Sequence, residues 1–301
     1  EKPLATTLQD HRRLLQVRQR TDARVVVGFV LRYTPFYAKV QELVSSDMLG
    51  RVMYLQATEH MGIWLTADCY LRGWRAQRDI AGPLLLEKCC HDIDIVNWVL
   101  GRRCEAVGAV TDRTVFVPRS DRPERCSLCD DTACPYRAAG TSAEHAADNT
   151  GQEIYVSGAN DLCVYNSRKD IADHTTVLAR YEGGIHVSFN VTMGVARGER
   201  RIRIVGSKAQ LSGCAEDNTI VLERLHADAR PETIVPERLG TGGHYGGDAV
   251  LARQFVNVAR DPGTRIDASV EDGFESGVIC LAADEAARTG QTVDVARYRE
   301  S

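Results

Sequence analysis

The stretch GPLLLEKCCHDIDIVNWVLG, residues 82–101, decides the fold because it predicts one long helix with two different faces. Proline directly after glycine is typical of a helix start, and a glycine at position 101 is typical of a helix end, so the helix is expected over residues 84–100. Polar and aromatic side chains at intervals of four, three and four residues fall on one stripe, which contains Glu87, His91, Asp94 and Trp98. Apolar side chains occupy the other positions and are expected to anchor the helix.

The spacing of Glu87 and His91 admits two interpretations. A carboxylate one turn before an imidazole can orient the ring and raise its basicity, as a general acid or base requires. The same spacing also suits a buried salt-bridge cluster that only fixes the packing of the helix. Lys88 is ambiguous in the same way, since it either faces a substrate or pairs with Asp92 one turn later.

Segments of helix and strand alternate along the chain and predict an α/β fold. Residues 4–20 have helical spacing, and the β-branched run DARVVVGFV at 22–30 is typical of a strand buried on both faces. A helix is expected from Pro35 to Val44. Alternating or β-rich segments predict a mostly antiparallel sheet, with strands over 51–60, 105–111, 161–165, 174–181, 184–193 and 201–206. Two further helices are expected near 247–260 and 269–288.

Composition excludes some classes of partner. The chain of 301 residues is 44% hydrophobic and 26% charged, which is enough to bury a large core. Its net charge of −4 comes from 37 basic and 41 acidic residues that are well mixed, so no one-sided positive field for nucleic acid is expected. The sequence contains neither a long apolar run nor a start typical of a signal peptide. We therefore expect a cytoplasmic protein that binds small molecules or other subunits, and neither nucleic acid nor a membrane.

Ten cysteines are expected to be reduced thiols, because the chain is long and has no export signal. Three of them stand in RCSLCDDTACPY, within a long insertion over 112–150. The C-x2-C-x4-C spacing of Cys126, Cys129 and Cys134 could supply three thiolates to a structural zinc ion, with His145 or Cys104 as the fourth ligand. A loop of free thiols is the alternative.

Several motifs spread over nearly the whole chain resemble one family. They are EKP at 1–3, GFVLRYTP at 28–35, LGRV at 49–52, LRGWR at 71–75, LLEKCCHDIDIVNWVLG at 85–101, RIRIVGSKAQLSG at 201–213 and GGHYGGD at 242–248. In these stretches the chain resembles the Gfo/Idh/MocA family of NAD(P)-dependent oxidoreductases. The resemblance implies a Rossmann nucleotide-binding domain followed by an α/β domain with an open sheet, with a sugar or polyol substrate between them.

The resemblance also implies a division of the chain. Residues 1–50 are expected to be the C-terminal remnant of the Rossmann domain, and residues 51–301 the domain for substrate binding and oligomerisation. The family's G-x-G-x-x-G phosphate loop does not occur in this sequence. The chain thus resembles an N-terminally truncated member, and by itself it is expected to bind NAD or NADP weakly or not at all.

Site residues follow from the same resemblance. Lys2, Glu87 and His91 are expected at the reacting carbon, with His91 as the base and Lys2 stabilising the developing alkoxide. Glu87 stands where the family more usually has aspartate. The other implied contacts are Glu1, Lys2 and Arg32 with the cofactor, and Trp74, Arg75 and Lys88 with the substrate.

Three functions from different classes follow from these observations. The favoured one is a sugar or polyol dehydrogenase. A noncatalytic relative that serves assembly is the second. A metal-dependent hydrolase is the third, because a histidine followed by aspartate on a helix is also typical of phosphohydrolases. A homo-oligomer is also expected, since strands such as 184–193 leave one face of an open sheet to be covered, and the resemblance implies that another subunit covers it.

Overall fold

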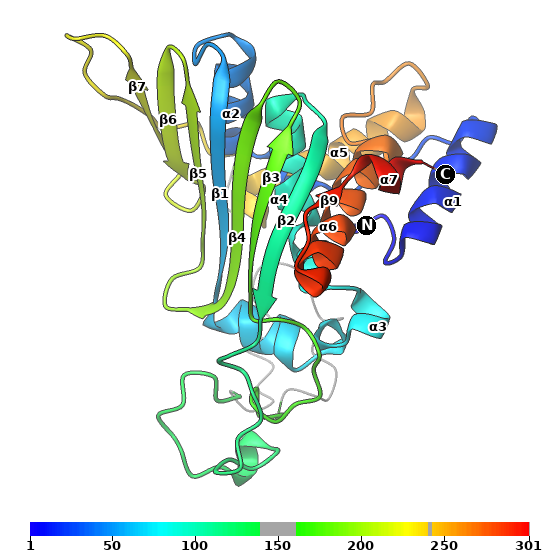
Figure 1. The fold of residues 1–301 in the computed structure, drawn as a ribbon, viewed down its shortest axis with the longest axis vertical. Coiled ribbons are helices and arrows are strands. Elements are labelled where there is room, and N and C mark those ends of the chain that lie inside the picture. The colour runs from blue at the N-terminus through cyan, green and yellow to red at the C-terminus, as the bar shows by residue number, and fades with distance from the viewer. Residues whose placement is uncertain (139–160, 240–242, 301) are drawn as a thin grey trace.

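A single mixed sheet organises the protein, whose computed structural model describes residues 1–138, 161–239 and 243–300 (Figure 1). Within these residues the sheet has nine strands, in the order β8-β7-β6-β5-β1-β4-β3-β2-β9. The strands are β1 Val52–Gly62, β2 Cys104–Asp112, β3 His174–Tyr181, β4 Ile185–Val195, β5 Glu199–Gly206, β6 Ala209–Cys214, β7 Thr219–Arg224, β8 Glu232–Ile234 and β9 Val293–Asp294. Only β1 and β4 pair in parallel among the described strands, which confirms an open, mostly antiparallel sheet.

Helices cover one side of this sheet; in Figure 1 α2 and α4 lie behind the strands, whereas α1, α6 and α7 lie to their right. The longer ones are α1 Leu8–Arg20, α2 Pro35–Ser45, α4 Leu84–Leu100, α5 Gly247–Arg260 and α6 Val270–Thr289. Shorter helical turns are η1 Val30–Tyr33, η2 Leu65–Leu71, η3 Trp74–Ala76, α3 Arg78–Ala81, η4 Cys126–Leu128, η6 His244–Gly246 and α7 Ala296–Arg299. None of the described helices is both long and apolar enough to cross a lipid bilayer.

Side chains alternate between the two faces of the sheet, as expected for strands covered on one side. On β1, Leu55 and Glu59 are buried toward the helices, whereas Gln56 is exposed on the opposite face. We call that opposite side the outer face. It exposes large apolar side chains at Leu178 on β3 and Val110 on β2, which are 64% and 67% exposed.

Helix α4 has the bounds predicted from its flanking glycines and proline. Pro83 takes the cap position before it, and Gly101 ends it with a left-handed backbone at φ +56°. Unlike a typical surface helix, α4 is buried on all sides from Leu84 through Val96. Polar groups on such a helix must find partners inside the protein or line an internal site.

Two predicted strands are wrong. The run at 22–30 is extended but forms no ladder; Val27 N–H donates to the Ala268 carbonyl at 2.9 Å, and Phe29 N–H to the carbonyl of Val27 itself at 2.8 Å. Its side chains instead join the hydrophobic core that α4 and α6 share. Residues 161–165 form only an isolated bridge, between Leu162 and Arg125. Apolar β-branched residues thus indicated burial at both places, but not pairing.

Candidate active site

Glu87, in the first turn of α4, is the centre of a cluster of polar side chains. Its carboxylate accepts a hydrogen bond from Arg75 Nε at 2.7 Å and another from the Tyr70 hydroxyl. Lys2 Nζ lies 3.5 Å from Glu87 Oε1 and also donates to the Glu87 backbone carbonyl. The structure therefore brings the predicted residues Lys2, Glu87 and Arg75 together, from three separate segments of the chain.

Donors around Glu87 keep its carboxylate ionised. Burial opposes ionisation, because Glu87 is only 3% exposed, but the charges of Lys2 and Arg75 and the hydrogen bond from Tyr70 outweigh burial and lower its pKa. An ionised Glu87 in turn attracts the Lys2 side chain and keeps it at the edge of the cluster. The Lys2 side chain remains 20% exposed, so its amino group can reach a ligand.

His91 lies one turn after Glu87 and is 3% exposed. Neither ring nitrogen has a hydrogen-bond partner among the described residues, which is rare for a buried imidazole. Burial, together with the nearby charges of Lys2, Lys88 and Arg200, lowers the pKa of His91 well below its ordinary value. The ring is therefore neutral near pH 7 and has a lone pair available to accept a proton.

An aromatic and cationic edge flanks the cluster. Arg75 stacks over the Trp74 ring, with its guanidinium carbon 4.4 Å from the ring centroid, and Trp74 is 43% exposed. Tyr70 belongs to η2, a single π-helical segment, and such segments are frequent at functional sites. The sequence did not point to Tyr70, because a short π-helix has no recognisable residue pattern.

The polar stripe predicted on α4 divides into two parts. Glu87 and His91 lie in the cluster, whereas Asp94, one turn further on, forms a two-pronged ion pair with Arg32 at 2.7 and 2.5 Å. Arg32 also contacts Asp272 at 2.9 Å and lies over the Trp98 ring. Its guanidinium is thus fully engaged inside the protein.

The structure also places two other predicted site residues, Lys88 and Glu1. Lys88 pairs with Glu59 of β1 at 2.8 Å, and not with Asp92 as the helical interval had suggested. Glu1 is exposed and lies next to Gly28. Their roles toward substrate and cofactor stay predictions.

His244 and Tyr245, which belong to one of the motifs behind the family resemblance, form a turn whose strain the sequence did not reveal. His244 and Tyr245 both have positive φ, at +45° and +57°, which is costly for residues other than glycine and is concentrated at functional sites. Tyr245 donates to Glu216 Oε1 at 2.6 Å, and His244 Nδ1 lies 2.9 Å from Asp248. His244 is near enough to His91 for its charge to contribute to the lowered pKa of that ring.

The predicted zinc site is not supported. Cys126, Cys129 and Cys134 do line one small cavity. However, no three histidine, cysteine, aspartate or glutamate side chains in the described part of the chain are placed to hold a metal ion. Arginines face two of the sulfurs instead, with Arg72 donating to Cys126 Sγ at 3.7 Å. The candidate ligand His145 lies outside the described residues.

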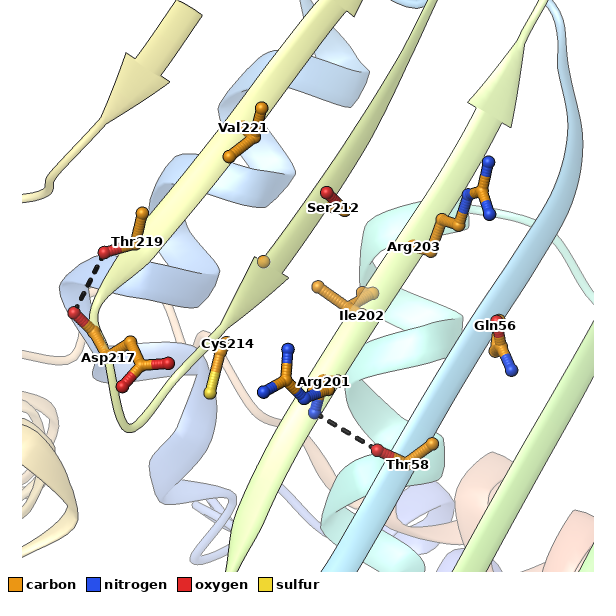
Figure 2. Close-up of a pocket in the computed structure, with 11 residues that line it drawn as sticks. Gln56, Thr58, Arg201, Ile202, Arg203, Ser212, Cys214, Asp217, Thr219 and Val221 are labelled. Carbon is orange, nitrogen blue, oxygen red and sulfur yellow. Dashed lines mark hydrogen bonds between the residues drawn. The ribbon is translucent and has the colours of Figure 1, made fainter. Parts of the chain in front are cut away.

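A larger cavity, of about 370 Å³, lies on the outer face of the sheet and not at the Glu87 cluster (Figure 2). Strands β1, β5, β6 and β7 form it, and the residues that line it include Gln56, Thr58, Arg201, Arg203 and Ser212. The groove holds hydroxyl and guanidinium groups together with the buried Cys214 thiol, whose pKa is raised by burial.

Known proteins share this architecture. The model of the Gfo/Idh/MocA C-terminal domain matches residues 37–212, more than half of the chain. The Bacillus subtilis protein YteT, which is named as an oxidoreductase, is 26% identical over 312 residues, covering 95% of this chain and 71% of YteT. Myo-inositol 2-dehydrogenase of Thermotoga maritima is 27% identical over 117 residues, which make up 39% of this chain and 32% of that enzyme.

Solved structures extend the likeness to nearly the full chain. Levoglucosan dehydrogenase in complex with NADH and levoglucosan superposes with a TM-score of 0.73, over 97% of this chain and 72% of that one, at 19% identity. The fold and the relatives together define an α/β protein of the oxidoreductase class. The chain belongs to the Gfo/Idh/MocA family, as its motifs predicted.

Proposed function

We propose that the protein is an NAD(P)-dependent dehydrogenase that oxidises a secondary alcohol of a sugar or polyol. The observation that carries this proposal is the buried His91 ring with two unpartnered nitrogens, one turn from the pair formed by Lys2 and Glu87. Relatives named for levoglucosan and myo-inositol support the substrate class.

Each side chain of the cluster would have a separate role in the reaction. Neutral His91 accepts the proton of the substrate hydroxyl, and the Lys2 ammonium stabilises the negative charge that develops on the oxygen. Glu87 holds Lys2 in place. Trp74 and Arg75 offer an exposed aromatic and cationic edge for the remainder of the substrate.

The residues of this chain fit the reacting end of such a cofactor. A bound nicotinamide would supply the hydride acceptor, and the unpartnered His91 nitrogens with the partly exposed Lys2 are the groups that would meet it together with the substrate. Glu1 remains a proposed contact with the cofactor. Asp94 and Asp272 already engage the Arg32 guanidinium, so Arg32 would act by fixing the position of η1.

The proposal includes a cytoplasmic location. All ten cysteines are free thiols, and thiols persist in reducing compartments. Burial raises the pKa of several of them, including Cys90 to about 12, so these thiols are poorly reactive.

The function is tested by assaying the complete protein with NAD and NADP against a panel of sugars and polyols. Reduction of either nucleotide by at least one alcohol is expected. Nucleotide binding without reduction for any alcohol, or the absence of binding to the complete protein, would instead support the noncatalytic alternative.

A pH profile tests His91 as the base. The folded protein lowers the pKa of His91 by burial and by neighbouring positive charge, so the ring loses its proton at a lower pH than an ordinary histidine. We expect kcat/KM to remain level as the pH falls through 6.5 and to decline only at clearly lower pH. An acidic limb with an apparent pKa of 6.5 or above would show that another group is the base.

We also propose that the outer face of the sheet mediates homo-oligomer formation. Exposed Leu178 and Val110 lie there on β3 and β2, which β4 separates from the strands that form the groove of Figure 2. Light scattering at micromolar concentration is expected to give a multiple of the chain mass, and Leu178→Arg should lower it, because a buried charge disfavours association. Leu128→Arg, at a site 70% exposed on η4, is the matched control. A monodisperse wild-type monomer would contradict this proposal.

A further inference from the structure

Four buried charged side chains between α4 and the sheet have no part in the proposed reaction. They are Glu59, Lys88, Asp92 and Arg200, which are 2%, 6%, 5% and 8% exposed. Buried charges are costly unless they are paired. We refer to these four residues as the buried quartet.

Contacts within the buried quartet compensate its two negative and two positive charges. Lys88 Nζ lies 2.8 Å from Glu59 Oε1, and Arg200 Nε lies 2.7 Å from Glu59 Oε2. Arg200 Nε also donates to Asp92 Oδ1 at 2.9 Å. Strands β1 and β5 thereby fix the position of the Asp92 carboxylate on α4.

Two oxygens of the buried quartet, Glu59 Oε2 and Asp92 Oδ2, have no hydrogen-bond partner among the described residues, and Glu59 Oε2 has the Arg200 cation 2.7 Å away. Asp92 Oδ2 is buried and accepts no hydrogen bond from any described residue, and it lies 3.4 Å from the equally unpartnered His91 Nε2. Consecutive residues on a helix normally point in different directions. Here the bond from Arg200 turns the Asp92 carboxylate so that its free oxygen faces the imidazole.

We propose that Asp92 is a positioning residue that fixes the tautomer of His91. A carboxylate only accepts hydrogen bonds, and a neutral imidazole has one donor and one acceptor nitrogen. The nitrogen that faces Asp92 is therefore the donor, Nε2–H, and the lone pair resides on Nδ1. Nδ1 is then the atom that receives a proton.

The consequence for catalysis rests on the proposed function. As the substrate O–H bond breaks, its proton forms the Nδ1–H bond, and the ring becomes a cation beside Lys2, Lys88 and Arg200. Burial raises the pKa of Asp92, whereas Arg200 and Lys88 oppose that shift. In its ionised form the Asp92 carboxylate, with Oδ2 3.4 Å from His91 Nε2, offsets the repulsion. Positioning partners of this kind typically contribute roughly 10- to 100-fold in activity.

The test compares Asp92→Asn with wild type in the complete protein, using nitrogen NMR of labelled histidine, with the His91 signals assigned by their loss in His91→Gln. We expect wild-type His91 to be the neutral Nε2–H tautomer. In Asp92→Asn the amide can also donate, so the Nδ1–H tautomer should appear, with kcat falling roughly 10- to 100-fold and KM changing much less. Asp94→Asn is the matched control, since Asp94 is also buried and paired with arginine on α4 but does not contact His91; it should leave the tautomer unchanged.

Each outcome decides between the hypotheses. An Nδ1–H tautomer in wild type, or an unaltered tautomer in Asp92→Asn, overturns the positioning role whatever the activity. If Asp92→Asn does not fold, the wild-type tautomer alone decides. A tautomer that responds to Asp92 in a protein that oxidises no alcohol would retain the positioning role and reject the dehydrogenase.

Discussion

Replacing His91 by alanine is expected to lower the turnover of the complete enzyme by a factor of about 10² to 10⁴ while the protein remains folded, because the reaction loses its general base. His91 makes no hydrogen bond to any described residue, so its removal leaves no internal donor or acceptor unpaired. The stability cost then comes from the cavity that a buried ring leaves, which is on the order of 3–5 kcal/mol for large aromatic side chains, so stability and turnover are measured separately. Steady-state rates of nicotinamide reduction and thermal melting followed by circular dichroism measure the two effects.

An exposed histidine provides the control for this experiment. His226 follows β7 in an exposed segment far along the chain from α4, so His226→Ala should retain both turnover and melting temperature. If His91→Ala folds normally and retains full turnover, the assignment of the base is wrong. If it unfolds while its residual folded fraction remains fully active, the polar cluster on α4 is structural.

Asp94→Ala is expected to lower the free energy of unfolding by about 3–5 kcal/mol, the usual cost of removing one partner of a buried ion pair. Arg32 is 5% exposed at its side chain and would retain only Asp272 as a carboxylate partner. For a protein of this size the loss corresponds to a melting temperature lower by roughly 10 °C. Urea or thermal denaturation measures it directly.

The chain contains a matched control for that prediction. Arg119 and Asp121 form a two-pronged pair with the same chemistry, at 3.0 and 2.6 Å, but their side chains are 41% and 60% exposed. Solvent screens exposed pairs, so Asp121→Ala should leave the free energy of unfolding nearly unchanged. Equal losses at Asp94 and Asp121 would show that burial does not determine the value of the Arg32 pair.

Local signals in the sequence predicted α4 and the centre of the site. Proline, glycine and the four-residue interval between Glu87 and His91 act within one or two turns of the chain, so the helix and the proximity of these side chains could be read directly. EKP was placed at the site by family resemblance alone, and the structure brings Lys2 to Glu87.

Residues that reach the site through long-range pairing could not be predicted. Glu59 and Arg200 come from strands whose register depends on β1 lying between β4 and β5, which no local pattern specifies. The sequence did not predict strands β6 to β8 for a related reason. Their segments are short, and they form strands only through pairing with neighbouring strands. The spacing of Cys126, Cys129 and Cys134 predicted a zinc site that the structure does not support, because suitable intervals along the chain did not place the thiols to hold a metal ion among the described residues.

Side chains alternate between the two faces of the sheet along β1, so the number of residues ahead of Glu59 determines which face its carboxylate lies on. Leu55 and Glu59 face the helices, and Gln56 and Thr58 face outward toward the groove of Figure 2. A one-residue insertion or deletion ahead of Glu59 would exchange the two sets, because side chains on a strand repeat every two residues. It would carry the glutamate to the outer surface and leave Lys88 without its carboxylate. Substitutions at Gln56 or Thr58 therefore leave the charge balance around His91 intact. A single inserted or deleted residue in β1 ahead of Glu59 removes that balance.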